Sequence, residues 1–180
     1  MAEATTQPWH ADRRLSHLLE VWQQQYPGPG RLPPRLAIDP IALGPELLPY
    51  VALIEAVDGG RRFRFRLVGS RLAQNAGLDL AGRHVDEVNP NRSYAAYIAE
   101  LYTQSMSARR PVYSETRYRS GSGRIGLTRR LICPLSSDGE QIDMFVAAQV
   151  FEADNGLGDT PTYTFAEGFE PGATLVLPAV

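Results

Sequence analysis

The sequence predicts an α+β fold in which a five-stranded antiparallel sheet carries helices on one face. Along the strand expected at residues 62–69, Arg alternates with apolar residues, which is typical of a half-buried antiparallel strand. Three further strands, at about 112–120, 124–135 and 141–152, follow one another through short turns and form a meander. A long helix lies between the first strand pair and this meander, which indicates the α+β class.

The N-terminal part predicts an amphipathic helix and a linker. Asp12 can cap a helix whose apolar positions recur at helical spacing, at Leu15, Leu18, Leu19, Trp22 and Tyr26. The run Pro27-Gly28-Pro29-Gly30 ends this helix. Its apolar stripe must pack on something, either on the core of the same chain or on a second copy of itself.

The remaining elements follow in order. A short helix is expected from Asp39 to about Leu48, then a strand at 51–57 that is joined by Asp58-Gly59-Gly60 to the strand at 62–69. Short helices are expected at 70–76 and 83–88, and Ser93 is a plausible cap for the long helix that reaches about Ala108. Residues 153–180 show little periodicity and predict an irregular tail. The expected segments are thus 1–30 (helix and linker), 31–153 (main domain) and 154–180 (acidic tail).

The 180 residues include 18 Arg and no Lys, which excludes Schiff-base lysines and phosphate-loop lysines. The net charge of −2 is unevenly spread: residues 1–60 carry −3, residues 61–130 carry +9 and residues 131–180 carry −8. Either the acidic tail folds near the basic face, or that face is kept for an anionic partner.

The chain has a single cysteine, Cys133, so it forms no internal disulfide, and its three His show no metal-ligand spacing. No apolar run approaches the ~18 residues that span a bilayer. The N-terminus lacks a basic region followed by an apolar stretch, so no signal peptide is expected and cytoplasmic localisation is predicted.

Three phrases carry a family resemblance. They are Phe63-Arg64-Phe65-Arg66-Leu67-Val68-Gly69-Ser70, Gly77-Leu78-Asp79-Leu80-Ala81-Gly82-Arg83 and Cys133-Pro134-Leu135-Ser136-Ser137-Asp138-Gly139. With the order of elements over about residues 14–153, the sequence resembles the PAS domain, the sensory fold of bacterial signalling. It is most similar to a single-domain PAS family of alphaproteobacteria that was formerly a domain of unknown function. The resemblance implies a PAS-like sheet and a stand-alone sensory or protein-interaction module without its own output domain.

PAS domains commonly hold a ligand between the sheet and the helices. The residues that the resemblance places on such a wall are Phe63, Phe65, Leu67, Leu72, Val85, Tyr97, Leu101, Tyr102, Leu127, Arg129 and Leu131. The alternative is that these residues fill a closed core. Arg129 shares a strand face with Leu127 and Leu131, so it needs an anionic ligand or partner there, unless a bulge turns it outward.

The residues argue against haem and flavin as cofactors, and the ligand stays unidentified. Haem-binding PAS domains usually place a ligating His on the long helix, where this sequence has none, although His84 lies just before it. Flavin photochemistry in this fold needs a Cys on the short helices, whereas Cys133 lies on a strand. No catalytic constellation is visible, so no enzymatic activity is predicted.

Six arginines are expected on the outer face of the sheet: Arg62, Arg64, Arg66, Arg117, Arg119 and Arg130. In PAS proteins this face and the preceding helix often form a dimer interface, so a homodimer is expected through Leu15, Leu18, Leu19 and Trp22. The preferred function is sensing of a small molecule or docking of a protein partner. Two alternatives stay open: a ligand-binding protein or enzyme with the same cavity, or a binder of anions or nucleic acid through the Arg face. The acidic pI and the lack of a recognition helix argue against nucleic acid, and no membrane partner is expected.

Overall fold

Six antiparallel strands form one sheet in the order β2-β1-β5-β4-β3-β6 in the computed structural model, which describes residues 7–89, 91–119, 125–152 and 169–179. The strands are β1 (Val51–Val57), β2 (Arg62–Val68), β3 (Val112–Arg119), β4 (Ile125–Leu135), β5 (Met144–Phe151) and β6 (Glu170–Val176). The helices are α1 (Arg13–Gln24), α2 (Pro40–Leu47), α3 (Ser70–Ala76) and α4 (Arg92–Ala108). The predicted α+β class with an antiparallel sheet is confirmed.

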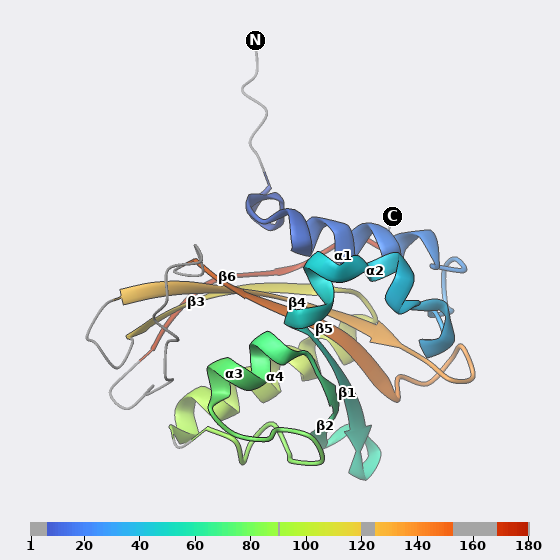
Figure 1. Ribbon diagram of the computed structural model, residues 1–180. Helices are drawn as coiled ribbons and strands as arrows, with labels where there is room; N and C mark the ends of the chain where they lie inside the picture. The colour runs from blue at the N-terminus through green and yellow to red at the C-terminus, as the bar shows by residue number, and fades with distance from the viewer. Residues whose placement is uncertain (1–6, 90, 120–124, 153–168, 180) are drawn as a thin grey trace.

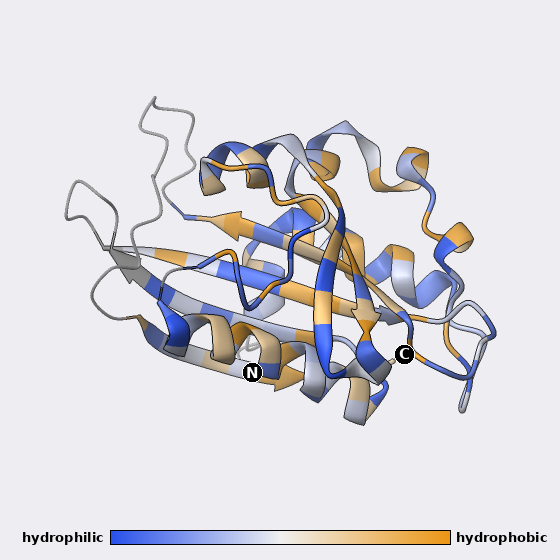
Figure 2. Cartoon of the chain, turned by 90° about the horizontal axis from the view of Figure 1, so that it is seen from below, coloured by the Kyte–Doolittle hydropathy of each residue, from blue (hydrophilic) through white to orange (hydrophobic). Residues whose placement is uncertain are grey.

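Helices cover both faces of the sheet: α1 and α2 lie on one side, and α3 and α4 on the other (Figure 1). Hydrophobic and hydrophilic residues alternate along several strands (Figure 2), because successive side chains of a strand point to opposite faces. On β4, Leu131 and Cys133 belong to the apolar cluster beneath α1, whereas Ile132 belongs to the cluster beneath α4. The sheet is therefore buried on both sides.

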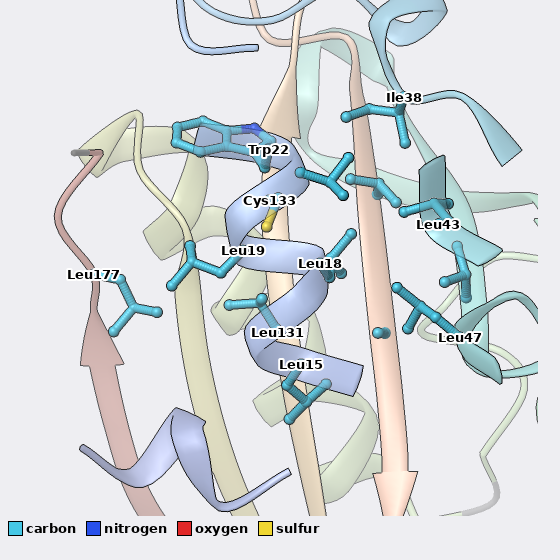
Figure 3. Packing of buried hydrophobic residues seen from close by; sticks show 14 of the residues in the cluster. Leu15, Leu18, Leu19, Trp22, Ile38, Leu43, Leu47, Leu131, Cys133 and Leu177 are labelled. Carbon is cyan, nitrogen blue, oxygen red and sulfur yellow. The ribbon is translucent and has the colours of Figure 1, made fainter. Parts of the chain in front are cut away.

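Helix α1 is part of this buried core. Asp12 caps it, since its carboxylate accepts a hydrogen bond of 2.9 Å from the backbone N–H of Arg14. The apolar stripe of α1 faces the sheet above Leu131 and Cys133 (Figure 3). The indole Nε1 of Trp22 donates a hydrogen bond of 2.8 Å to the carbonyl oxygen of Pro134.

This packing corrects the predicted dimer contact. Leu15, Leu18 and Trp22 are 0% exposed and Leu19 is 5% exposed within the single chain. An apolar stripe has to be buried, but the sequence left open whether its own sheet or a second copy buries it. All four side chains are buried against the sheet of their own chain, so they offer no free surface to a second copy.

The sheet also has a sixth strand, β6, where the sequence predicts an irregular tail. β6 pairs antiparallel with β3, with Val176 opposite Val112 and Thr174 opposite Ser114. Most of its residues are exposed, so no buried alternating pattern marked it, and Pro171 with Gly172 at its start is typical of a loop. The rest of the predicted tail, at 153–168 and 180, lies outside the described residues.

Strand β2 contains an irregularity that changes which face Leu67 meets. Its pairing with β1 is continuous from Arg62 to Phe65 and shifts by one residue before Leu67, which lies opposite Leu53. A β-bulge of this kind reverses the alternation of side chains beyond it. Leu67 is consequently 49% exposed, and Val68 packs against the cluster beneath α4 instead.

Among the described residues, no helix is both long enough and apolar enough to cross a membrane.

Candidate functional site

A pocket of about 170 Å³ lies between the sheet and the helices α3 and α4. Its wall is mostly apolar, and it comes from β2, β4, β5, α3, α4 and the loop that joins the two helices. The lining residues are Phe65, Leu72, Ala76, Leu78, Leu80, Val85, Val88, Asn89, Tyr94, Ala95, Ile98, Arg130, Gln149 and Phe151. An apolar cavity with a few convergent polar groups is the usual form of a small-molecule site.

The loop wall is held against the edge of the sheet by backbone hydrogen bonds. Phe65 N–H donates to Arg83 C=O at 2.9 Å, and Val85 N–H donates to Phe63 C=O at 2.8 Å. These bonds pair residues 82–85 with β2. The pairing protects the outer edge of β2 and places Val85 over the sheet, where it is buried.

The polar end of the pocket is formed by Tyr94, Arg130 and Gln149. Arg130 is 5% exposed. Its guanidinium donates one hydrogen bond of 3.1 Å to Thr116 Oγ1 and another to the hydroxyl of Tyr94. Its Cζ atom lies 5.5 Å from the centre of the Tyr94 ring. A buried positive charge is thus held by neutral groups at the wall of an apolar pocket.

The structure places three of the eleven predicted ligand-binding residues on this wall: Phe65, Leu72 and Val85. Four others belong to or pack against the core beneath α4 but do not line the pocket: Phe63, Tyr97, Leu101 and Tyr102. Phe63 stacks on Tyr102 with ring centres 5.0 Å apart. Leu67 is turned away by the bulge in β2.

The remaining three, Leu127, Arg129 and Leu131, were assigned to the wrong face of β4. Leu131 is buried beneath α1, and Arg129 forms ion pairs with Glu115 at 3.2 Å and with Glu152 at 3.8 Å. A shift of one residue moves every side chain of a strand to the opposite face. The apolar run that includes Leu131 packs on α1, so the neighbouring Arg130 takes the position at the pocket.

The predicted ladder of arginines is likewise not a single face. Arg130 is buried on the α4 side, while Arg62 pairs with Asp86 at 2.9 Å and with Glu87 at 2.6 Å. Arg64 pairs with Glu55 at 2.7 Å. Arg66 and Arg117 are exposed, and the side chain of Arg119 lies outside the described residues. Two of these charges are therefore matched by carboxylates of the same chain.

Two surface grooves are larger than the pocket, at about 480 Å³ between α1 and α2 and about 550 Å³ beside the β4–β5 turn. Charged side chains such as Arg13, Glu20 and Glu140 line them, and neither groove holds a buried charge without a carboxylate partner. In the described part of the chain, no group of three His, Cys, Asp or Glu residues could hold a metal ion. His84 contacts Glu87 at 3.3 Å and does not line the pocket.

Solved structures with a similar fold include proteins of two bacteria. The dimer of Vibrio cholerae VqmA in the absence of target DNA shares 15% sequence identity at a TM-score of 0.50, over 66% of this chain and 52% of that one. A VqmA–ligand–DNA complex gives 15% identity and a TM-score of 0.49, over 59% and 48% of the two chains. The LOV protein of Rhodobacter sphaeroides shares 12% sequence identity at a TM-score of 0.45, over 59% of this chain and 61% of that one. The chain thus spans about half to three fifths of the length of these proteins.

No curated protein sequence matches the chain. At these identities the structural likeness shows the fold alone. The family comes from the sequence, because a profile of the PAS domain matches residues 11–148, which include α1, the strands β1 to β4, part of β5 and most of the pocket wall. The chain therefore belongs to the PAS domain family.

Proposed function

We propose that the chain is a sensory module that binds a small molecule in the pocket between the sheet and the helices α3 and α4. The observation that carries this proposal is Arg130, a charged side chain that is 5% exposed at the wall of a mostly apolar pocket. Polar groups inside proteins normally have a structural partner or a functional use. Membership of the PAS family supports a sensory use of such a pocket.

Strand β4 offers a route from the pocket to the other face of the sheet. Arg130 faces the pocket, while its neighbour Leu131 packs beneath α1. A ligand that prefers one position of β4 would therefore change the packing of α1, and with it a surface that a partner protein can read. The response then depends on the difference in ligand affinity between the two arrangements, not on affinity alone.

Native mass spectrometry of the freshly purified protein, with one variant that fills the pocket, tests the proposal. Ala95 lines the pocket and is 4% exposed, whereas its neighbour Ala96 on α4 is exposed. Ala95→Leu adds three carbon atoms to the pocket wall, and Ala96→Leu adds the same atoms to the solvent side. Melting temperatures show whether both variants fold.

The wild type and Ala96→Leu are expected to retain a bound small molecule, and Ala95→Leu to lose it. If the wild type carries no molecule, a screen of metabolites by thermal shift replaces this readout. The proposal is wrong if no compound stabilises the wild type, or if Ala95→Leu binds as well as Ala96→Leu.

A further inference from the structure

Arg130 differs from other arginines of the chain in what balances its charge. Arg62, Arg64 and Arg129 each lie within 4 Å of a carboxylate. Arg130 is 5% exposed, yet in the described ranges it forms no ion pair and hydrogen-bonds only to hydroxyl groups. A buried charge without a counter-ion is strongly unfavourable. The site therefore suits an anion that none of the described residues supplies.

The hydroxyl groups around Arg130 do not provide the missing negative charge. Burial raises the pKa of Tyr94, and the charge of Arg130 opposes this shift only in part, so the phenol stays neutral near pH 7. Thr116 is neutral at every accessible pH. Ser114 lies opposite Arg130 in the β3–β4 ladder, and its buried hydroxyl has no hydrogen-bond partner among the described residues. This region thus combines an unbalanced charge with an unused polar group.

The pocket itself limits the size and character of the anion. Its volume is about 170 Å³, and an engineered apolar cavity of about 150 Å³ accommodates benzene. Beyond the polar end, the wall is apolar except for Asn89, with Leu72, Ile98 and Phe151 among its members. A single guanidinium matches one negative charge, and its planar fork suits the two oxygens of a carboxylate.

We propose that the pocket binds a small monocarboxylate whose apolar body is about the size of one six-membered ring, with its carboxylate on Arg130. This inference rests on the proposed function, since it assigns a ligand class to the same pocket. The carboxylate contacts the guanidinium beside Tyr94, and the ring lies among the apolar side chains of α3, α4 and β5.

Isothermal titration calorimetry with benzoate, benzamide and acetate separates the two parts of the proposal. Benzamide keeps the ring and the shape of benzoate but has no charge, and acetate keeps the charge without the ring. A hydrogen bond to a charged group contributes more binding free energy than a neutral one, and the difference corresponds to about tenfold in affinity. Benzoate is therefore expected to bind about ten times more tightly than either probe.

Three variants locate the binding. Arg130→Gln is expected to lower benzoate affinity about tenfold and to leave benzamide affinity unchanged within about threefold. Arg130→Lys keeps the charge but loses the planar fork, so it should fall between the wild type and Arg130→Gln. Arg129→Gln is the matched control, because Arg129 lies on the opposite face of β4 and should leave benzoate binding unchanged. Thermal melts establish which variants fold.

The outcomes distinguish this inference from the proposed function. Equal binding of benzoate and benzamide to the wild type overturns the assignment of an anion, even if Arg130→Gln does not fold, and leaves the pocket as a ligand site. If acetate binds the wild type as tightly as benzoate does, the proposal that the ligand has an apolar body is wrong. If native mass spectrometry shows a retained neutral molecule that Ala95→Leu loses, the carboxylate assignment is wrong while the sensory pocket stands. If none of the probes binds, the inference is also wrong.

Discussion

Replacement of Leu18 by Ala measures how much α1 contributes to the folded chain. Leu18 is 0% exposed within the apolar cluster beneath α1. The substitution removes three carbon groups, which at about 0.8 kcal/mol each amounts to about 2.4 kcal/mol of lost burial. The cavity between a helix and a rigid sheet adds to this, so we expect a loss of about 3–4 kcal/mol, within the range of other buried Leu→Ala substitutions.

Urea denaturation followed by circular dichroism provides the measurement. The matched control is Leu36→Ala, because Leu36 is 92% exposed and the same truncation there should cost less than about 0.5 kcal/mol. The loss for Leu18→Ala should be the same at two protein concentrations tenfold apart. A loss below about 1 kcal/mol, or one that disappears at the higher concentration, would refute the packing of α1 in the core of its own chain.

Three further predictions concern single positions. A Cβ atom on Gly69 would overlap the backbone carbonyl oxygen of Pro49. Gly69→Ala should therefore cost about 1–3 kcal/mol in the same urea assay, and a value near zero contradicts this close approach. Burial alone would raise the pKa of Asp12, but the hydrogen bonds and the charge of Arg14 outweigh burial and lower this pKa below its ordinary value of 3.8. The ionised carboxylate therefore stabilises the fold at pH values above 3.8, the pKa in the unfolded chain. Asp12→Asn should therefore cost about 1 kcal/mol at pH 7, and its difference from the wild type should shrink as the pH falls below 3.8; a gap that widens in acid contradicts the sign. Burial raises the pKa of the Cys133 thiol, so an aromatic disulfide reagent should label it only at urea concentrations that unfold the chain, and rapid labelling in native buffer would show that α1 does not cover it.

Most local elements were predictable from the sequence because each has its own signal. The short helix expected at 83–88 was wrong, since this segment is a loop whose start pairs with the edge of β2. The predicted strand at 51–57 coincides with β1, and the cap at Asp12 begins α1. Helix α4 is capped by Asn91 and not by the expected Ser93, so its predicted start was two residues too late. Asn and Ser are both favourable N-cap residues, and the sequence alone did not decide between them. Hydrophobic periodicity and helix capping depend on residues that are close in the sequence, so both can be recognised without the tertiary structure.

The candidate site was harder to predict because it depends on which helix covers which face. Alternation along β4 shows that Arg129 and Arg130 point to opposite sides, but not which side meets α4. That choice follows from the packing of α1 on Leu131, a contact between distant segments. Leu67 was misplaced for a different reason, since one extra residue in β2 has no signature in a regular alternating sequence.

Homodimer formation stays a prediction. The four apolar residues of α1 that were expected to form its contact are buried within one chain, so any dimer must use another surface.

A crystal structure of the protein grown with benzoate tests the central claim most directly, because it shows both the pocket and the group that the ligand contacts. We expect the carboxylate within hydrogen-bond distance of the Arg130 guanidinium and the ring between α3, α4 and β5. Benzoate bound only at surface arginines, with side chains closed across an empty pocket, would contradict the account.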